Sequence, residues 1–490
     1  MDSCRAPDLK TDRIGDGELK IITEVRSLDG ANEPAPSRLG AKSGSVRRNR
    51  IGSTLASACR EERFEQLSSS ETAHPRAAAG EHIMQDVNVS RRSAVEFRAV
   101  PTPWIRPGVV VHDAGLLVDA LLEEFSLVLR SRGFDVHGYV QRSDRDCTRK
   151  GDGCSIRVNY RDVGSEKILS LERGAVAALL REARSRNSDL VVFSRFSACL
   201  PLDEGVEPAF QLFSKGPPIL TSIAGQCVEK WHSRTGHEGA LLAPDIKSLW
   251  RWWGPERLYR DLILGVDESE VRRIVCGARW IMVEGPSGTG LAYLPKHPRE
   301  LASRLPRHAR ESLRTLAELA QSTDPLDTAL GVAAINAHYN RVGLDAKAGN
   351  GAKKLRDVPG RPVAIGAFPG IDGIFPDCTV VETDPRPNEY PLAALDALLP
   401  GRGAAVINSS ALINRSLSRI LRLAASRDVA LIGPSTPLTP RLFDYGLRVL
   451  GGLIVDDTDG LANAIASGAL PREFGRFGRF VHLDCSESSK

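Results

Sequence analysis

Short apolar runs, separated by stretches with helical periodicity, constrain the last third of this chain more than any other feature. The runs are Arg361–Ala367, Cys378–Asp384, Ala404–Ser410, Asp428–Gly433 and Gly452–Asp457, and the predicted helices are Pro391–Leu399, Ser416–Ser426 and Pro440–Leu450. Neighbouring parallel strands need a long crossover between them, and a helix usually supplies it. The alternation therefore predicts a Rossmann-like doubly wound α/β sheet over residues 358–480.

Residues 106–254 show a second alternation of the same kind. The predicted strands are Gly108–Ala114, Phe134–Arg142, Asp189–Phe196 and Pro217–Ala224, and the predicted helices include Leu116–Arg132 and Gly174–Arg186. We interpret the stretch after the second strand, which carries Cys147 and Cys154, as a polar loop. The pattern predicts a parallel α/β domain.

A small α+β unit is predicted between these domains, over residues 268–345. A hairpin-like strand pair runs to Tyr293, and helices are predicted over Arg299–Ala320 and Pro325–Tyr339. Within the strand pair, GPSGTG (Gly285–Gly290) looks like a phosphate-binding loop. However, Leu291 stands where that motif needs a lysine to reach the β- and γ-phosphates. We therefore interpret the motif as a hairpin turn.

The composition excludes several classes of protein. Lys and Arg total 65 against 61 Asp and Glu, and a net charge of +4 does not favour a nucleic-acid-binding protein. No window approaches the roughly 20 apolar residues of a membrane helix, and the first residues lack the apolar core of a secretory signal. Nine cysteines, an odd number, suit reduced thiols. We expect a cytoplasmic homo-oligomer with a mostly disordered tail over residues 1–105.

The junction after the fourth apolar run offers groups that suit an anion. Gly433 and Pro434 end the run, and Ser435 and Thr436 follow, ahead of a predicted helix. Backbone N–H groups and hydroxyls at the start of a helix favour an anionic or polar ligand. We therefore predict ligand contacts from Gly433, Ser435 and Thr436.

The loops after the first two runs add further candidates. IGAFPGIDG (Ile365–Gly373) lies where a dinucleotide-binding loop would, but it is not G-x-G-x-x-G, so we expect Gly366, Phe368 and Pro369 to wall a pocket instead. Glu382 and Asp384 end the second run, where an acidic residue often bonds ribose hydroxyls. Capping of the following turn is the simpler role for these carboxylates.

The third loop contributes polar side chains to the same predicted edge. Asn408, Ser409, Ser410 and Asn414 follow the third run. Ligands of open α/β sheets bind at the carboxyl ends of the strands, so we predict that Ser409 and Asn414 contact the ligand. Serine and asparagine also cap helix N-termini, which is the alternative. No His, Cys and carboxylate spacing predicts a transition-metal cage here.

The C-terminal half resembles a family of proteins described as putative heavy-metal chelation proteins. The resemblance rests on RWIMVEGPSGTGLAY, DPLDTALGVAAINAHYN, AIGAFPG, VVETDPRP, INSSALINRSL and GPSTPLTPRLFDYG, which occur in the family's order. It implies a domain like the N-terminal domain of enolase over residues 268–345, followed by a Rossmann-like metal-chelation domain over 358–480.

The N-terminal half looks like an uncharacterised bacterial family related to P-loop nucleoside triphosphatases. The resemblance rests on VVVHDAGLLVDALLEEF, GFDVHGYVQR and DLVVFSRFSACLPLDEG. It implies a molybdenum or metal-cofactor context. The first loop, HDAGLLVD, lacks the Gly-Lys-Ser/Thr that holds phosphate and magnesium, so the domain is predicted to be a degenerate, non-hydrolysing relative.

Three functional hypotheses follow. The leading one is a protein that binds a small anionic ligand, a metal or metal oxyanion, or a metal-cofactor precursor, with metal-cofactor maturation proteins as partners. The second is a nucleotide- or S-adenosylmethionine-dependent enzyme built on the same sheet. The third is a non-catalytic scaffold for metal-cofactor maturation. None of them requires a nucleic-acid or membrane partner.

Overall fold

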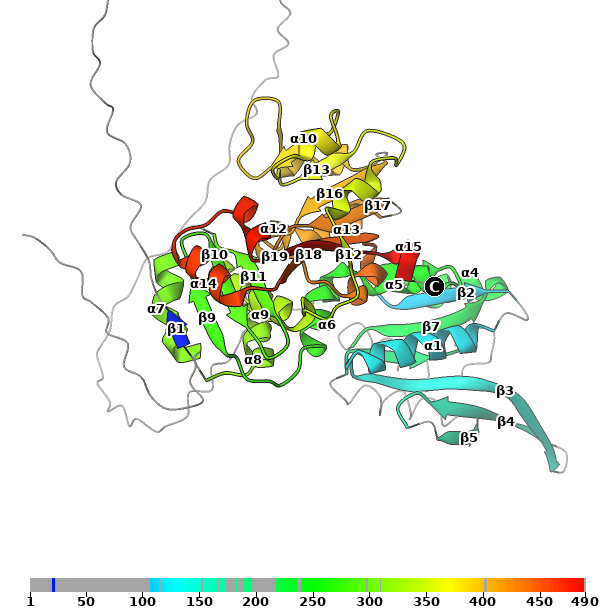
Figure 1. Cartoon of the computed structure of the whole chain (residues 1–490). Helices are drawn as coiled ribbons and strands as arrows, with labels where there is room; N and C mark the ends of the chain where they lie inside the picture. The colour runs from blue at the N-terminus through cyan, green and yellow to red at the C-terminus, as the bar shows by residue number, and fades with distance from the viewer. Residues whose placement is uncertain are drawn as a thin grey trace, which may run out of the picture. The chain divides into compact units, whose positions relative to one another are not determined.

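Three β-sheets organise the part of the chain that the computed structural model describes (Figure 1). The described residues are 20–22 and 106–488, with gaps at 114–116, 151–152, 166, 173–181, 183–187, 196–216, 236–238, 296–297, 309, 401–402 and 426. The predicted disordered tail, apart from 20–22, and most of the predicted helix over 174–186 lie outside them. Among the described residues, no helix is long and apolar enough to cross a membrane.

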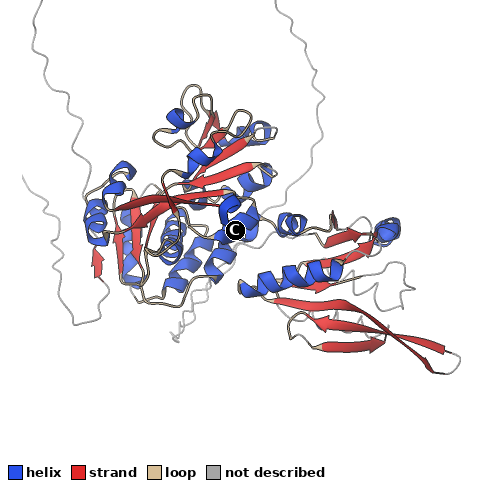
Figure 2. Ribbon diagram, turned by 45° about the vertical axis from the view of Figure 1, so that its right-hand side comes forward, coloured by secondary structure: helices blue, strands red, loops and turns tan. Residues whose placement is uncertain are grey.

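The first sheet has the strand order β5-β4-β3-β6-β7-β2-β8. Its elements are β2 Gly108–His112, α1 Val118–Ser131, β3 Val136–Lys150, β4 Gly153–Asp162, β5 Ile168–Glu172, β6 Leu190–Phe193, β7 Ile219–Ala224, α4 Val228–Thr235, β8 Ala240–Leu242 and α5 Ile246–Trp253. Strands β3, β6, β7, β2 and β8 are parallel, and helix α1 packs along β3 (Figure 2).

The predicted polar loop in this sheet is wrong. Strand β3 continues to Lys150 and turns back into β4, so that Cys147 pairs with Ile156 in an antiparallel ladder. The sequence that links the two strands is KGDG, and Asp-Gly between strands is a strong hairpin signal, which the many charged residues nearby concealed. The sheet is therefore mixed, with an antiparallel extension on a parallel centre.

The second sheet forms a small α+β unit, with the strand order β1-β9-β10-β11. Its elements are β1 Lys20–Ile22, β9 Arg273–Cys276, β10 Trp280–Glu284, β11 Thr289–Tyr293, α7 Pro298–His308, α8 Leu313–Glu318 and α9 Pro325–Tyr339. The hairpin interpretation of GPSGTG is confirmed, because the Gly285 N–H donates to the Gly288 carbonyl at 2.9 Å between β10 and β11. The long helix predicted over residues 299–320 is two helices, since Ser312 caps a new one.

The third sheet has the strand order β12-β19-β18-β17-β16-β13-β14-β15. Its elements are β12 Lys347–Ala348, β13 Val363–Ile365, α10 Ile371–Ile374, β14 Thr379–Glu382, β15 Tyr390–Pro391, α11 Leu395–Leu398, β16 Ala404–Asn408, α12 Ser410–Ile413, α13 Leu417–Leu423, β17 Asp428–Ile432, β18 Val449–Val455, α14 Thr458–Ala466, β19 Gly478–Asp484 and α15 Cys485–Ser488. The six strands from β18 to β15 in this order are parallel. The doubly wound α/β prediction is confirmed.

The helix predicted over Pro440–Leu450 is wrong. A short 3-10 helix, η8 Pro440–Tyr445, ends at Gly446, whose φ of 94° is a left-handed conformation that glycine adopts without strain. The chain then enters β18, which begins at Val449 and is buried along its whole length. No α-helix therefore follows Ser435 and Thr436, and the helix-dipole argument for an anion at these two residues loses its basis.

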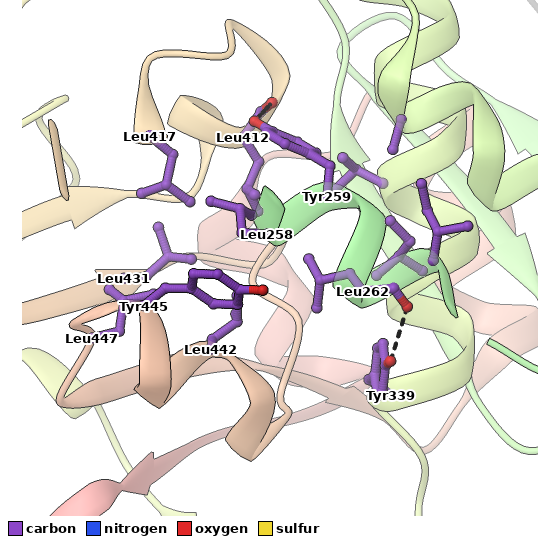
Figure 3. Packing of buried hydrophobic residues seen from close by; sticks show 14 of the residues in the cluster. Leu258, Tyr259, Leu262, Tyr339, Leu412, Leu417, Leu431, Leu442, Tyr445 and Leu447 are labelled. Atoms are coloured by element: carbon purple, nitrogen blue, oxygen red, sulfur yellow. Dashed lines mark hydrogen bonds between the residues drawn. The ribbon is translucent and has the colours of Figure 1, made fainter. Parts of the chain in front are cut away.

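A continuous hydrophobic core joins the second and third sheets through helix α6 Leu258–Leu264 (Figure 3). Leu258 and Leu262 are buried among apolar side chains of both units. Two buried tyrosines fasten the helix, because Tyr259 donates to the Leu412 carbonyl at 2.7 Å and Tyr339 donates to the Leu262 carbonyl at 2.9 Å. These bonds satisfy hydroxyls that would otherwise be costly to bury.

Candidate functional site at the carboxyl edge of the third sheet

The third sheet reverses its direction of winding between β13 and β16. From β13 the chain passes to β14 and β15 on one side, and later to β16, β17 and β18 on the other. Ligands of open α/β sheets bind in the crevice outside the carboxyl ends of the strands at such a switch point. The loops after β13, β14 and β16 therefore define the candidate site.

The backbone of a single residue, Ala367, is held from both neighbouring strands. The Ala367 N–H donates to Glu382 Oε1 at 2.6 Å, and the Ala367 carbonyl accepts from Asn408 Nδ2 at 3.2 Å. Glu382 Oε2 also accepts from the Thr383 N–H at 3.2 Å, and Asn408 Oδ1 accepts from the Ser410 N–H at 3.0 Å. We call the side chains of Glu382 and Asn408, with the Ala367 backbone N–H and carbonyl between them, the Ala367 clamp.

Gly366 makes the clamp possible. Its φ of 79° is left-handed, and a Cβ at this position would lie 2.7 Å from Asn408 Cβ. Glycine thus lets the chain turn sharply and lets the loop lie against Asn408. Ala367 is exposed, and Glu382 and Asn408 are partly exposed, so the clamp is both fixed and accessible to a ligand.

The other residues predicted on these two loops lie around the clamp. Phe368 is partly buried against the apolar cluster on one face of the sheet, while Pro369 and Asp384 are exposed. The loop therefore has an apolar side that faces the core and a polar side that faces solvent. The structure brings together Gly366, Glu382 and Asn408, with Phe368, Pro369 and Asp384 on the same two loops.

Ser435 and Thr436 lie in the interior, with exposed fractions of 0%. Ser435 Oγ accepts from the Tyr293 N–H of β11 at 3.1 Å, and the Ser435 N–H donates to Ser409 Oγ at 3.3 Å. Strand β11 is the edge strand of the second sheet, and unpaired edges invite unwanted pairing. The loop from Gly433 thus covers this edge and joins the two units.

Asn340, at the end of α9, fastens the same loop. It donates to the carbonyls of Thr436 at 3.0 Å and Leu453 at 3.3 Å, and it accepts from the Leu438 N–H at 2.8 Å. Asn340 is 1% exposed, so these bonds satisfy its amide in the interior. The described contacts of the Ser435 loop are structural.

Asn414 lies apart from the clamp and is exposed. Its Oδ1 accepts from the Ser416 N–H at 3.1 Å and from Ser416 Oγ at 2.6 Å, just before helix α13 begins. This is an Asx-turn, in which the side chain of an asparagine accepts from the backbone N–H two residues further on. The ten predicted contact residues therefore divide between the exposed clamp region, the buried Ser435 loop and this turn.

The sequence alone missed the central element of the site. Asn408 was recognised only as one of several polar residues, and nothing in the sequence singles out the Ala367 backbone. The available signal is a glycine directly after a parallel strand, with a carboxylate and an amide ending the two adjacent strands.

The thiols and carboxylates of the described residues form no evident metal site. No group of three or more His, Cys, Asp or Glu that could hold a metal ion occurs within these ranges. Burial raises the pKa of Cys276 to about 12 and also raises that of Cys378, which keeps both thiols protonated at neutral pH. Cys227 is disulfide-bonded, whereas Cys276, Cys378 and Cys485 are outside any disulfide, so the prediction of reduced cysteines is wrong for Cys227.

Residues 259–339 and 353–484 each match a protein-family model. Both models carry the description "Putative heavy-metal chelation". The predicted resemblance of the C-terminal half is thereby confirmed, and the description supports metal or ligand binding by this half. Residues 108–252 match a third model, described as "Protein of unknown function (DUF2478)".

Solved structures and a curated relative were also found. A DUF364-family protein from Desulfitobacterium hafniense is 26% identical with a TM-score of 0.43, and one from Pyrococcus horikoshii is 21% identical with a TM-score of 0.41. Each alignment covers 46% of this chain and 98% of the other. A human cancer-related nucleoside triphosphatase is 16% identical, with a TM-score of 0.21, over 28% of this chain and 87% of its own.

The curated relative is the molybdenum import ATP-binding protein ModC 2 of Bradyrhizobium diazoefficiens. It is 28% identical over 153 residues, and the match covers 28% of this chain. The chain spans only 17% of that protein's length. The N-terminal half thus has a weak similarity to P-loop nucleoside triphosphatases, as predicted.

Proposed function

We propose that the C-terminal half binds a small metal complex or metal-cofactor precursor at the Ala367 clamp. The observation that carries the proposal is the clamp itself, in which Glu382 and Asn408 fix the accessible backbone of Ala367 at the switch point of a doubly wound sheet. The family description of heavy-metal chelation supports a metal-containing ligand.

The hydrogen bonds of Glu382 limit the kinds of ligand that the clamp can bind. Each carboxylate oxygen accepts one backbone N–H, and an ionised carboxylate has about four lone-pair sites. The remaining sites can accept a hydroxyl, an amine or a metal-bound water from a ligand. Because the described residues contain no three-ligand cage, a metal would arrive with ligands of its own.

The location of the protein, its metal and its partners are also proposed. A cytoplasmic protein that handles molybdenum is supported by the 28% match to a molybdenum import ATP-binding protein. Metal-cofactor maturation proteins would be its partners, and the chain would act as a homo-oligomer. Cell fractionation and size-exclusion chromatography with light scattering test the location and the oligomeric state.

Calorimetric titration of the full chain tests ligand binding. The titrants are Ni²⁺, Zn²⁺, their citrate complexes, and molybdate. We expect at least one metal complex to bind, and Glu382→Gln to weaken its binding about tenfold or more, because a charge-assisted contact is lost. Glu300→Gln is the matched control, since Glu300 is an exposed carboxylate on helix α7, in the unit of the second sheet, and pairs with Arg304. If none of these titrants binds, or if both variants behave alike, the proposal fails.

A nucleotide- or S-adenosylmethionine-dependent enzyme is the second candidate. The observation that favours it is the position of Glu382 at the end of the strand next to the first loop, where an acidic residue bonds ribose hydroxyls. Turnover of either compound that disappears in Glu382→Ala would support this candidate over simple binding.

A further inference from the structure

Among the lysines and arginines whose burial the structure describes, Arg257 alone is buried. It ends η4 Pro255–Arg257, ahead of helix α6, and is 6% exposed. Burying a charge is costly unless it is paired and hydrogen-bonded. The partners of this guanidinium therefore show how its charge is compensated.

The described partners of Arg257 use only part of its guanidinium. Nη1 donates to the Trp253 carbonyl at 2.8 Å, and the guanidinium carbon lies 4.1 Å from the centre of the Trp253 ring. An arginine carries five N–H donors. Its nitrogens are not among the fully buried side-chain atoms without a partner, so those that donate to no described group keep some contact with solvent.

The two carboxylates whose charges act on Arg257 form ion pairs with other arginines. Glu256 is paired with Arg422, with an Nε–Oε1 distance of 2.5 Å, and Asp189 is paired with Arg260 at 3.0 Å. Arg257 itself makes no ion pair within the described ranges.

Other largely buried arginines, unlike Arg257, are paired with carboxylates. Arg132, Arg273 and Arg441, whose side chains are 12%, 14% and 22% exposed, each lie within hydrogen-bonding distance of a carboxylate. The most deeply buried guanidinium is therefore the one that lacks a counter-ion.

Burial lowers the pKa of Arg257 to about 10, so the group is still charged at neutral pH. Stacking on an indole stabilises a cation, but it supplies no counter-charge. We propose that Arg257 anchors a binding site for a small tetrahedral oxyanion, such as inorganic phosphate or sulfate. Such an anion would accept the remaining N–H groups in the forked geometry that guanidinium offers.

The local charge balance suits a single small anion. Arg260 and Arg422 are the partners of Asp189 and Glu256, the two carboxylates whose charges act on Arg257. The three cations exceed the two anions by one charge. The slight exposure of Arg257 favours a free anion over one carried by a larger molecule. This site is separate from the Ala367 clamp and does not depend on the proposed function.

Calorimetric titration of the full chain with inorganic phosphate, and separately with sulfate, tests the site at matched ionic strength. We expect binding to the wild-type chain and a loss of about tenfold or more in affinity in Arg257→Met. Arg251→Met is the matched control, because Arg251 is an exposed arginine on the adjacent helix α5, and it should retain binding.

Three outcomes overturn the proposal: no binding of either anion, equal binding by the wild type and Arg257→Met, or an equal loss in Arg251→Met. If Arg257→Met does not fold, as judged by circular dichroism, Arg257→Lys replaces it. Lysine keeps the charge but lacks the fork, so its phosphate affinity should fall, and an unchanged affinity would contradict the site. Adenosine monophosphate should bind more weakly than phosphate, and tighter binding would contradict a small free anion.

Discussion

Replacing Asp261 by asparagine should strongly destabilise the fold, because its carboxylate is buried between two arginines. Asp261 lies on α6 and is 0% exposed. Its carboxylate accepts from Arg132 Nη1 at 2.6 Å, from Arg441 Nη1 at 2.6 Å and from the Tyr445 hydroxyl at 2.9 Å. One buried carboxylate thus balances two guanidinium groups that come from α1 and η8, far apart in the sequence.

The expected magnitude follows from these contacts. Removing one partner of a buried ion pair typically costs about 3–5 kcal/mol, because an uncompensated charge remains. Arg132 also pairs with Asp444, which keeps part of its counter-charge. We therefore expect Asp261→Asn to lower the free energy of unfolding by about 3 kcal/mol, near the lower end of that range.

Urea denaturation followed by tryptophan fluorescence measures this change. Trp250 is a local reporter, because it stacks with Arg132 and packs against Tyr445. Asp396→Asn is the control, since Asp396 pairs with Arg419 at the surface, with side chains 59% and 53% exposed. Such a pair contributes below about 1 kcal/mol. Equal effects of the two substitutions would refute the reasoning.

Three further predictions concern packing and pH. Asn340→Ala should lower the free energy of unfolding by about 2–3 kcal/mol in urea denaturation, because buried groups of the Ser435 loop lose their hydrogen-bond partners. A change near zero would show that Asn340 does not hold the loop. Gly290→Ala should prevent stable folding, since its Cβ would lie 2.0 Å from the Ala333 carbonyl oxygen, whereas Gly343→Ala has open space and should be tolerated. Burial lowers the pKa of His338 below 6.5, so the unfolded chain takes up this proton first as the pH falls. The wild type should lose more thermal stability than His338→Gln on acidification below 6.5, and parallel profiles would contradict this.

The parallel strands of the third sheet could be predicted because each is a short apolar run with a strong local signal. The loop after β13 could also be located, since Gly366 directly follows such a run. Its clamp could not, because the contacts of Ala367 come from strands 15 and 41 residues away. The sequence around Ala367 does not indicate which distant residues will contact it.

Two of the failed predictions have a common physical cause. Pro440–Leu450 has helical periodicity, but Gly446 and pairing with β17 and β19 place its last residues in a strand. Ser435 and Thr436 resemble an anion-binding junction, yet Ser435 bonds Tyr293, 142 residues earlier in the chain. In both cases tertiary contacts override the local preference.

Hydrogen exchange of the full chain, measured by mass spectrometry with and without the metal complex that binds best, tests the central claim most directly. The account predicts protection in peptides that cover the Ala367 clamp, residues 365–370, 382–384 and 408–410. Protection confined to other parts of the chain, with these peptides unchanged, would contradict it.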